Sequence, residues 1–204
     1  MDKQDLQTKS SSGCLELFKY SSGNPEDVVF SKKDRRFPER LTKDYVRSLP
    51  IISFKGEIHL IEKRNDLEKA IKNLSREKVL GFDTETRPNF KKGQKNDVSL
   101  IQLSTSKDAY LIRLNYLGLT SELVSLLTDK NILKVGVAIL DDIRALQRLC
   151  RFDPEGFIEL SNIGNHLGIV TCGLQNLAAI FFGVRITKKE RLTNWDRQEF
   201  NASQ

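Results

Sequence analysis

The sequence has few cysteines and no long apolar run. Its three cysteines, Cys14, Cys150 and Cys172, are odd in number and lack metal-site spacing, so we expect neither a disulfide framework nor a zinc site. The longest apolar run, residues 177–182, is far too short to cross a bilayer. Residues 1–4 do not begin a signal peptide. These absences predict a cytoplasmic protein in a reducing compartment, with no membrane partner.

The composition that is present indicates a globular protein with a modest basic excess. The chain has 204 residues, of which 39% are hydrophobic and 29% charged, enough for one sizeable core and a tail. Its 33 Lys and Arg outnumber its 27 Asp and Glu, which gives a net charge of +6. This balance is compatible with a polyanionic partner.

Residues 1–50 differ from the rest of the chain. Residues 10–13 and 21–25 are rich in Ser and Gly, and residues 32–36 form a charged run. Such a segment buries little apolar surface, so we predict a poorly ordered basic arm with room for a short helix. The arm is either solvated or contacts nucleic acid through its basic run. Residues 51–204 are predicted to form the folded domain.

Within that domain, strand and helix patterns alternate. Period-2 patterns and short apolar runs predict strands at 57–61, 79–82, 98–104, 109–112 and 132–137. Helical spacing predicts helices at 65–74, 119–127, 141–149 and 174–182. This order predicts an α/β fold in which helices flank a mixed five-stranded sheet. A ribonuclease H-like layout, with one antiparallel strand among parallel neighbours, satisfies it.

A pair of carboxylates at the end of a buried strand is the strongest chemical feature. Asp83 and Glu85 are two residues apart, so strand alternation places them on the same face. Carboxylates that close repel one another unless one is protonated or a cation lies between them. Hard oxygen ligands of this kind suit Mg²⁺ or Mn²⁺. The alternative is that both carboxylates are simply solvated.

The segment after the pair is basic. Residues 87–95 contain Arg87, Lys91, Lys92, Lys95 and one aromatic residue. Such a loop suits a phosphate backbone and a stacked base. The alternative is a mobile, solvated charged loop.

A second acidic pair begins a later helix. A buried strand at 134–137 passes through a small turn into a helix that carries Asp141 and Asp142. Asp141 is well placed to cap the helix, and the helix dipole favours Asp142 in the first turn. Capping explains one Asp but not the second.

Taken together, these motifs resemble the DEDD exonuclease superfamily, and within it the RNase D and Werner-type group. The resemblance runs from about residue 51 onward and rests on the order of six short motifs: Phe82-Asp83-Thr84-Glu85-Thr86, Ser99-Leu100-Ile101-Gln102-Leu103, Lys134-Val135-Gly136 leading to Asp142, Gly173-Leu174-Gln175-Asn176-Leu177-Ala178, Gly183-Val184, and Thr193-Asn194-Trp195. It implies a 3′-5′ exonuclease that hydrolyses phosphodiester bonds with two divalent ions, Mg²⁺ or Mn²⁺.

The resemblance also implies roles for particular residues. Asp83, Glu85 and Asp142 would be catalytic metal ligands, with Asp141 ranked second to Asp142. The nucleic-acid contacts would come from residues in and after the first motif: Thr84, Thr86, Arg87, Lys91 and Lys92. The implied partner is single-stranded or 3′-ended nucleic acid.

The third motif of the family has no match in this sequence. A Tyr-x-x-x-Asp or His-x(3–5)-Asp pattern is expected shortly after Asn194-Trp195, and residues 196–204 contain neither. The predicted domain is therefore incomplete at its C-terminus. Three hypotheses follow: part of an active exonuclease, a catalytically inactive nucleic-acid-binding module, or an interaction platform that binds no nucleic acid.

Overall fold

The structure is a computed structural model that describes residues 37–87, 96–187, 194–197 and 200. The chain divides into two units, residues 1–34 and 35–204, and every described residue belongs to the second. Most of the predicted arm therefore lies outside the described residues. Within its last part, α2 (Lys43–Ser48) is a short helix that Thr42 caps through its side chain.

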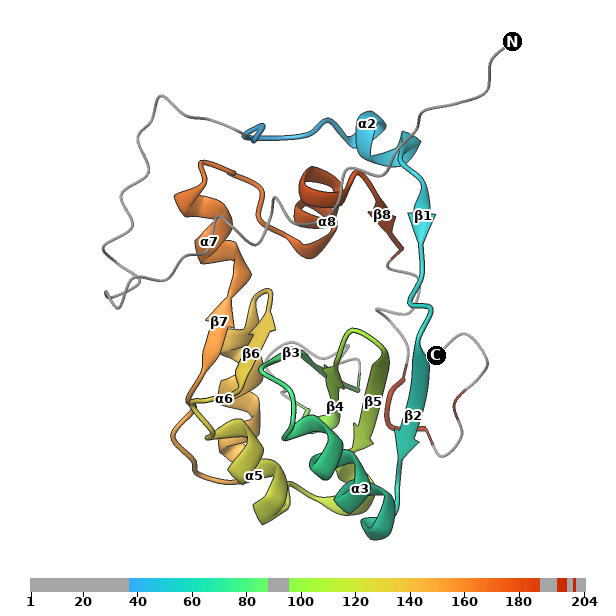
Figure 1. The fold of residues 1–204 in the computed structure, drawn as a ribbon, viewed down its shortest axis with the longest axis vertical. Helices are drawn as coiled ribbons and strands as arrows, with labels where there is room; N and C mark the ends of the chain where they lie inside the picture. The colour runs from blue at the N-terminus through green and yellow to red at the C-terminus, as the bar shows by residue number, and fades with distance from the viewer. Residues whose placement is uncertain (1–36, 88–95, 188–193, 198–199, 201–204) are drawn as a thin grey trace. The chain divides into compact units, whose positions relative to one another are not determined.

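A six-stranded mixed sheet forms the centre of the second unit (Figure 1). Its strand order is β2-β5-β4-β3-β6-β7. Only β4 runs antiparallel to its neighbours in this sheet; the other pairings are parallel. The strands are β2 (Glu57–Ile61), β3 (Val79–Thr86), β4 (Val98–Ser104), β5 (Asp108–Arg113), β6 (Leu133–Gly136) and β7 (Phe157–Glu159).

This sheet confirms the predicted α/β class and the single antiparallel strand, but the predicted number of five strands is wrong. The missed strand is β7, which pairs in parallel with β6 at the edge of the sheet. It has three residues, all of them half-buried. A strand this short has too few residues to show an alternation that sequence patterns can detect.

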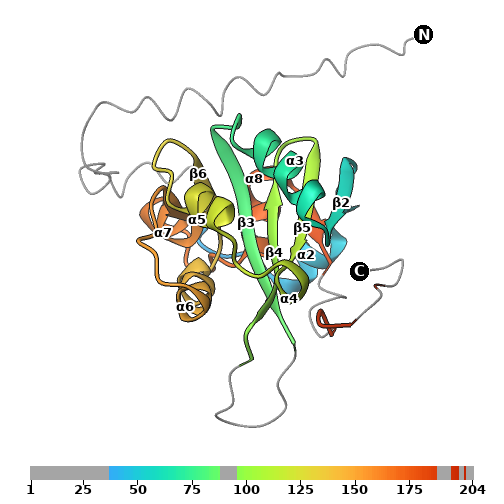
Figure 2. The same cartoon turned by 90° about the horizontal axis from the view of Figure 1, so that it is seen from below.

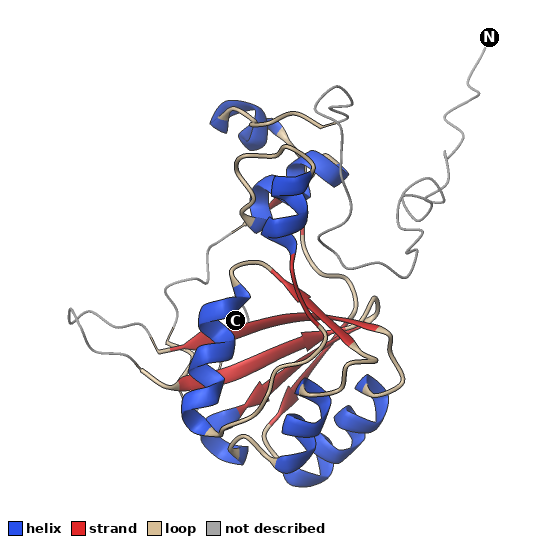
Figure 3. Cartoon of the chain, turned by 90° about the vertical axis from the view of Figure 1, so that its left-hand side faces the viewer, coloured by secondary structure: helices blue, strands red, loops and turns tan. Residues whose placement is uncertain are grey.

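Helices flank the sheet (Figure 3), and α3, α4, α5 and α6 all contribute to its core. Leu80 and Phe82 alternate inward from β3 and belong to one buried cluster with apolar residues of α3, α5 and α6. The sheet-flanking helices are α3 (Arg64–Leu74), α4 (Leu114–Leu117), α5 (Ser121–Leu127) and α6 (Ile139–Leu149). Because this face of β3 is filled with apolar contacts, its other face is left for polar side chains.

The remaining elements follow β7. They are α7 (Leu160–His166), α8 (Leu174–Phe182) and β8 (Arg185–Ile186), and β8 pairs in parallel with β1 (Ile51–Ile52). Gly183 ends α8 in the left-handed region at φ 63°, as its position after the apolar stripe predicts. No helix among the described residues is long and apolar enough to cross a membrane.

Candidate metal and nucleic-acid site

The first two predicted site residues lie on the central strand of the sheet. On β3, Leu80, Phe82 and Thr84 are buried, whereas Asp83 is exposed and Glu85 half-buried. The alternation places Asp83 and Glu85 on the same face of the strand, as expected. β3 lies between β4 and β6 (Figure 2), so both carboxylates project from the middle of the sheet rather than from its edge.

Asp142 reaches β3 from the first turn of α6. The hydroxyl of Thr84 donates a hydrogen bond to Asp142 Oδ1, and the backbone N–H of Thr84 donates to Asp83 Oδ1 at 2.9 Å. Thr84 thus binds one carboxylate through its side chain and another through its backbone. The structure gives this residue, predicted to contact nucleic acid, two partners inside the protein.

The charges of the three carboxylates affect one another. Burial, together with the charges of Asp83 and Asp142, raises the pKa of Glu85 to about 7. Burial also raises the pKa of Asp142 to about 6; the hydrogen bond from Thr84 opposes this shift, and the charges of Asp83 and Asp141 add to it. Although Asp83 as a whole residue is exposed, neighbouring protein atoms desolvate its carboxylate and raise its pKa, and the hydrogen bond from the Thr84 N–H opposes this shift. The three acidic groups are therefore electrostatic neighbours.

Among the described residues, none of these three carboxylates forms an ion pair with Lys, Arg or His. By contrast, Asp141 points into solvent, with a side chain that is 93% exposed, and pairs with Arg144 at 3.4 Å. Adjacent aspartates on one helix therefore differ: Asp142 faces the other carboxylates and Asp141 does not.

The start of α6 differs from the prediction. The helix begins at Ile139, and its N-cap is Ala138, a non-glycine residue in the left-handed region at φ 63°. The prediction that Asp141 caps this helix is wrong, because Asp141 already lies inside the first turn. Ala138 has no side-chain acceptor, so the exposed N–H groups of the first turn need a partner from elsewhere.

Glu159 at the end of β7 supplies that partner, and sequence reasoning missed it. Its Oε2 accepts a hydrogen bond from the N–H of Ile139 at 2.9 Å, and its Oε1 accepts from the N–H and hydroxyl of Ser161 at 3.0 and 2.7 Å. Burial alone would raise the pKa of Glu159, but these bonds and those from the backbone of Ala138 and Ile139 lower it. One carboxylate thus caps both α6 and α7 and fixes the turn that carries Asp142.

The predicted nucleic-acid contacts are only partly described. Thr86 is the exposed last residue of β3, and Arg87, also exposed, follows it. The carbonyl of Arg87 accepts a hydrogen bond from Asn96 Nδ2 at 2.8 Å. Arg87 also lines a pocket together with Ser99, Asn115 and Asp196. Lys91 and Lys92 lie outside the described residues.

A second group of metal-binding side chains lies elsewhere on the sheet. Glu57, His59 and Asp108 each offer a ligand atom, and all three atoms lie within 4.8 Å of one another. Among the described residues, no other group of three or more His, Cys, Asp or Glu meets this criterion. Asp83, Glu85 and Asp142 are therefore spread more widely than this second group.

Comparison with known proteins identifies the class of protein. A family model described as 3′-5′ exonuclease matches residues 58–203, so the chain belongs to this family, and the predicted resemblance is confirmed. The family consists of hydrolases that cleave phosphodiester bonds from the 3′ end.

Particular relatives agree with this assignment. The chain is 31% identical over 158 residues to the mouse bifunctional 3′-5′ exonuclease/ATP-dependent helicase WRN; the match covers 72% of this chain and 11% of that protein. Overall, the chain spans between 11% and 38% of the length of the curated relatives it matches.

Solved structures support the fold. The EXO domain of Aedes aegypti Nibbler superposes with a TM-score of 0.64 at 22% identity, covering 72% of this chain and 78% of that one. Escherichia coli RNase D superposes with a TM-score of 0.63 at 21% identity, covering 72% and 39%. The ribonuclease H-like fold predicted from the order of elements is therefore confirmed.

Proposed function

We propose that this domain removes nucleotides from the 3′ end of nucleic acid, and that Asp83, Glu85 and Asp142 are the metal ligands of the reaction. The observation that carries the proposal is geometric: Asp83 and Glu85 share a face of β3, and Thr84 between them binds Asp83 through its N–H and Asp142 through its hydroxyl. In support, burial and the charges of neighbouring acidic groups raise the pKa of Glu85 and of Asp142. Paired carboxylates with raised pKa values are typical of functional sites.

The donor set fits a hard divalent cation. All three side chains offer carboxylate oxygens, the ligands that Mg²⁺ and Mn²⁺ prefer. Among the described residues these groups have no basic partner, so a divalent ion would supply the missing positive charge. We propose Asp83 and Glu85 as direct ligands and Asp142 as the ligand of a second ion. Bound ions of this kind stabilise the charge of the scissile phosphate and lower the pKa of water.

Thr84 would orient the metal ligands, and residues after β3 would contact the nucleic acid. The Thr84 hydroxyl holds Asp142 toward β3, and its N–H holds Asp83, so one residue sets the direction of two ligands. Arg87 follows β3 in an exposed position, where its guanidinium suits a phosphate of a single-stranded 3′ end. We propose Thr86 and the Lys91–Lys92 pair as further contacts. A cytoplasmic location stays a prediction from the sequence.

The experiment is degradation of a 5′-labelled single-stranded oligonucleotide, as DNA and as RNA, with Mn²⁺ at pH 8. We expect a ladder of products shortened from the 3′ end, and its loss in Asp83→Asn. A matched control is Asp97→Asn, which changes a carboxylate outside the proposed ligand set. If the wild-type chain binds the oligonucleotide but yields no ladder, the binding-module hypothesis replaces this proposal. A ladder that persists in Asp83→Asn would reject the assigned site.

A further inference from the structure

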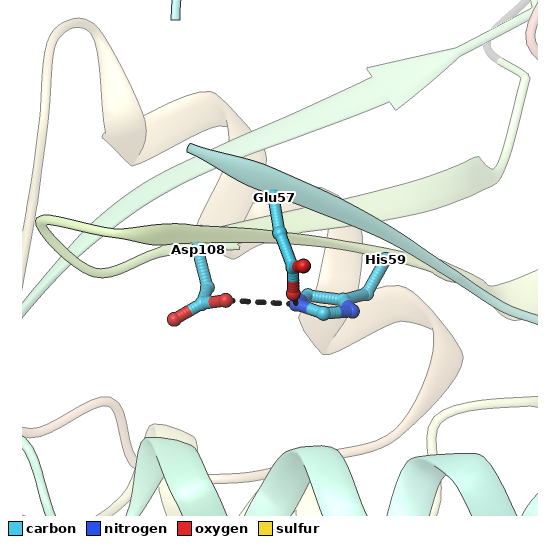
Figure 4. A group of neighbouring side chains, drawn as sticks. All are labelled: Glu57, His59 and Asp108. Carbon is cyan, nitrogen blue, oxygen red and sulfur yellow. Dashed lines mark hydrogen bonds and ion pairs between the residues drawn. The ribbon is translucent and has the colours of Figure 1, made fainter. Parts of the chain in front are cut away.

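The edge of the sheet brings together three metal-binding side chains that the proposed exonuclease site does not use. β2 is the edge strand and pairs in parallel with β5, so that Glu57 lies beside Asp108 and His59 beside Tyr110. Glu57 and His59 are two residues apart and share a face of β2. Figure 4 shows the Glu57, His59 and Asp108 side chains converging on one side of the two strands.

The spacing of the ligand atoms suits a small cation. His59 Nε2 lies 2.8 Å from Asp108 Oδ1 and 3.7 Å from Glu57 Oε2, and all three ligand atoms lie within 4.8 Å of one another. With metal–ligand bonds of about 2.0–2.2 Å, neighbouring ligand atoms of a tetrahedral Zn²⁺ site lie about 3.4 Å apart. The Glu57 side chain is 82% exposed and can rotate to adjust its distance.

The ring of His59 and the backbone of Glu57 are held in place, whereas the Glu57 side chain can rotate. The His59 ring stacks on Tyr110 with centroids 4.8 Å apart and an interplanar angle of 22°, and the Tyr110 hydroxyl accepts from Asn73 of α3 at 3.4 Å. The N–H of Glu57 donates to the carbonyl of Lys107 at 3.0 Å. A Cβ at Gly56 would lie 1.8 Å from that same carbonyl oxygen, so glycine lets the two strands approach this closely.

We propose that Glu57, His59 and Asp108 form a second metal site, which binds Zn²⁺ or a similar transition-metal ion and ties the edge strand β2 to β5. One imidazole nitrogen and two carboxylate oxygens are a donor set for Zn²⁺, whereas Mg²⁺ favours oxygen alone. Two carboxylates with a neutral imidazole carry a charge of −2, which a divalent ion cancels. Water completes the coordination, because only three protein ligands converge.

This site is separate from the proposed exonuclease site. In the strand order β2-β5-β4-β3, three strand spacings of about 4.8 Å each, or about 14 Å, separate β2 from the strand of Asp83. The ion would link His59 to a residue 49 positions away in the sequence. It would therefore stabilise the sheet without taking part in hydrolysis.

The simpler alternative is a protonated His59 paired with Asp108 and no metal. Isothermal titration with Zn²⁺ distinguishes the two, using the full chain with Asp83→Asn and Asp142→Asn to weaken the first site. We expect one Zn²⁺ per chain, at least tenfold weaker binding after His59→Ala, and unchanged binding after His166→Ala. His166, the second of the two histidines in the chain, is exposed and lies outside the group, so it is the matched control.

A second variant tests the site in case His59→Ala fails to fold. Glu57→Gln changes an exposed side chain, leaves the stacked His59 intact and should also weaken Zn²⁺ binding at least tenfold. Zn²⁺ should raise the midpoint of thermal unfolding in the background protein but not in His59→Ala or Glu57→Gln. Absence of Zn²⁺ binding in the background protein, or equal affinity in both variants, would overturn the proposal.

Discussion

The two acidic groups of this domain lie on the same sheet but differ in what balances their charge. At the edge, His59 already hydrogen-bonds Asp108 at 2.8 Å, and Glu57 is exposed to water. At the centre, burial raises the pKa of both Glu85 and Asp142, and no basic side chain among the described residues pairs with them.

The central group therefore lowers the stability of the folded state, and binding of a cation would relieve this cost. Carboxylates held together in a partly buried place without a counter-ion disfavour the folded state until a cation or a proton arrives. In the edge group, a hydrogen bond with His59 satisfies Asp108 and water solvates the exposed Glu57, so its carboxylates are not desolvated in the same way. Unbalanced negative charge of this kind is expected at positions where residues are selected for function rather than for stability.

The largest effect on the exonuclease rate is expected from substitution of Asp142, one of the two neighbouring aspartates of α6. Asp142→Asn should lower the exonuclease rate about 100-fold or more, because charge stabilisation by a metal supplies several kcal/mol. Asp141→Asn makes the same chemical change one residue earlier, on a side chain that is 93% exposed, and should change the rate less than threefold. Equal losses in single-turnover assays of both variants would remove the distinction between these residues.

The next largest effect should come from Glu159, which acts through the position of α6. Glu159→Gln keeps the size of the side chain but weakens the bonds to the N–H groups of Ile139 and Ser161, so Asp142 should lose its fixed placement. We expect a rate about 10-fold to 100-fold lower and a free energy of unfolding about 1–2 kcal/mol smaller.

The control for Glu159 is Glu155→Gln, at an exposed position just before β7. A metal titration separates a positioning role from a purely structural one. If Glu159→Gln lowers stability but leaves the Mn²⁺ dependence of the rate unchanged, this residue does not position Asp142.

The central group should make the stability of the domain depend on pH. The folded pKa of Glu85, about 7, lies above its ordinary value of 4.5, so the folded state binds more protons between these pH values. The contribution of Glu85 to stability without metal should therefore be fully present below pH 4.5 and be lost as the pH rises through about 7. We expect Glu85→Gln to remove about 1–2 kcal/mol of this loss, a figure reduced for screening of a half-buried group.

Urea unfolding in EDTA at pH 5 and pH 8 measures this difference. The matched control is Glu68→Gln, an exposed glutamate of α3 that lies 3.8 Å from Arg64. A wild-type protein whose stability rises steadily from pH 5 to pH 8, with Glu85→Gln following the same curve, would contradict the assigned coupling.

The smallest expected effect is that of the edge group on catalysis. The strand that carries His59 lies about 14 Å from β3 across the sheet. The variant His59→Ala should therefore change the exonuclease rate less than twofold at saturating Mn²⁺. A large loss of rate in a folded His59→Ala protein would show that the two groups are coupled.

Much of the fold could be predicted because local patterns decide it. The predicted bounds of β2, β4 and α8 agree residue for residue with the structure, since alternation in β2, a short apolar run in β4 and helical spacing in α8 mark them in the sequence. The start of α6 could not be predicted in this way. Its capping acceptor is Glu159, 20 residues further along the chain, and no local pattern connects the two.

The same limit applies to the candidate sites. Alternation alone places Asp83 and Glu85 together, and likewise Glu57 and His59. Asp108 joins His59 only through the register of β2 against β5, which pairs residues 51 positions apart. The sequence signal that could have found this group was a Glu-x-His on a predicted strand, which is weak without that register.

Mn²⁺ binding measured by electron paramagnetic resonance at pH 8 tests the central claim most directly. The wild-type chain is compared with the triple variant Asp83→Asn, Glu85→Gln and Asp142→Asn, and with Asp141→Asn as the control. We predict that the triple variant binds fewer Mn²⁺ ions per chain than the wild-type and control chains, because only the proposed edge site can remain, while all three stay folded. Equal Mn²⁺ binding by all three chains would contradict the assignment of these carboxylates as the metal ligands.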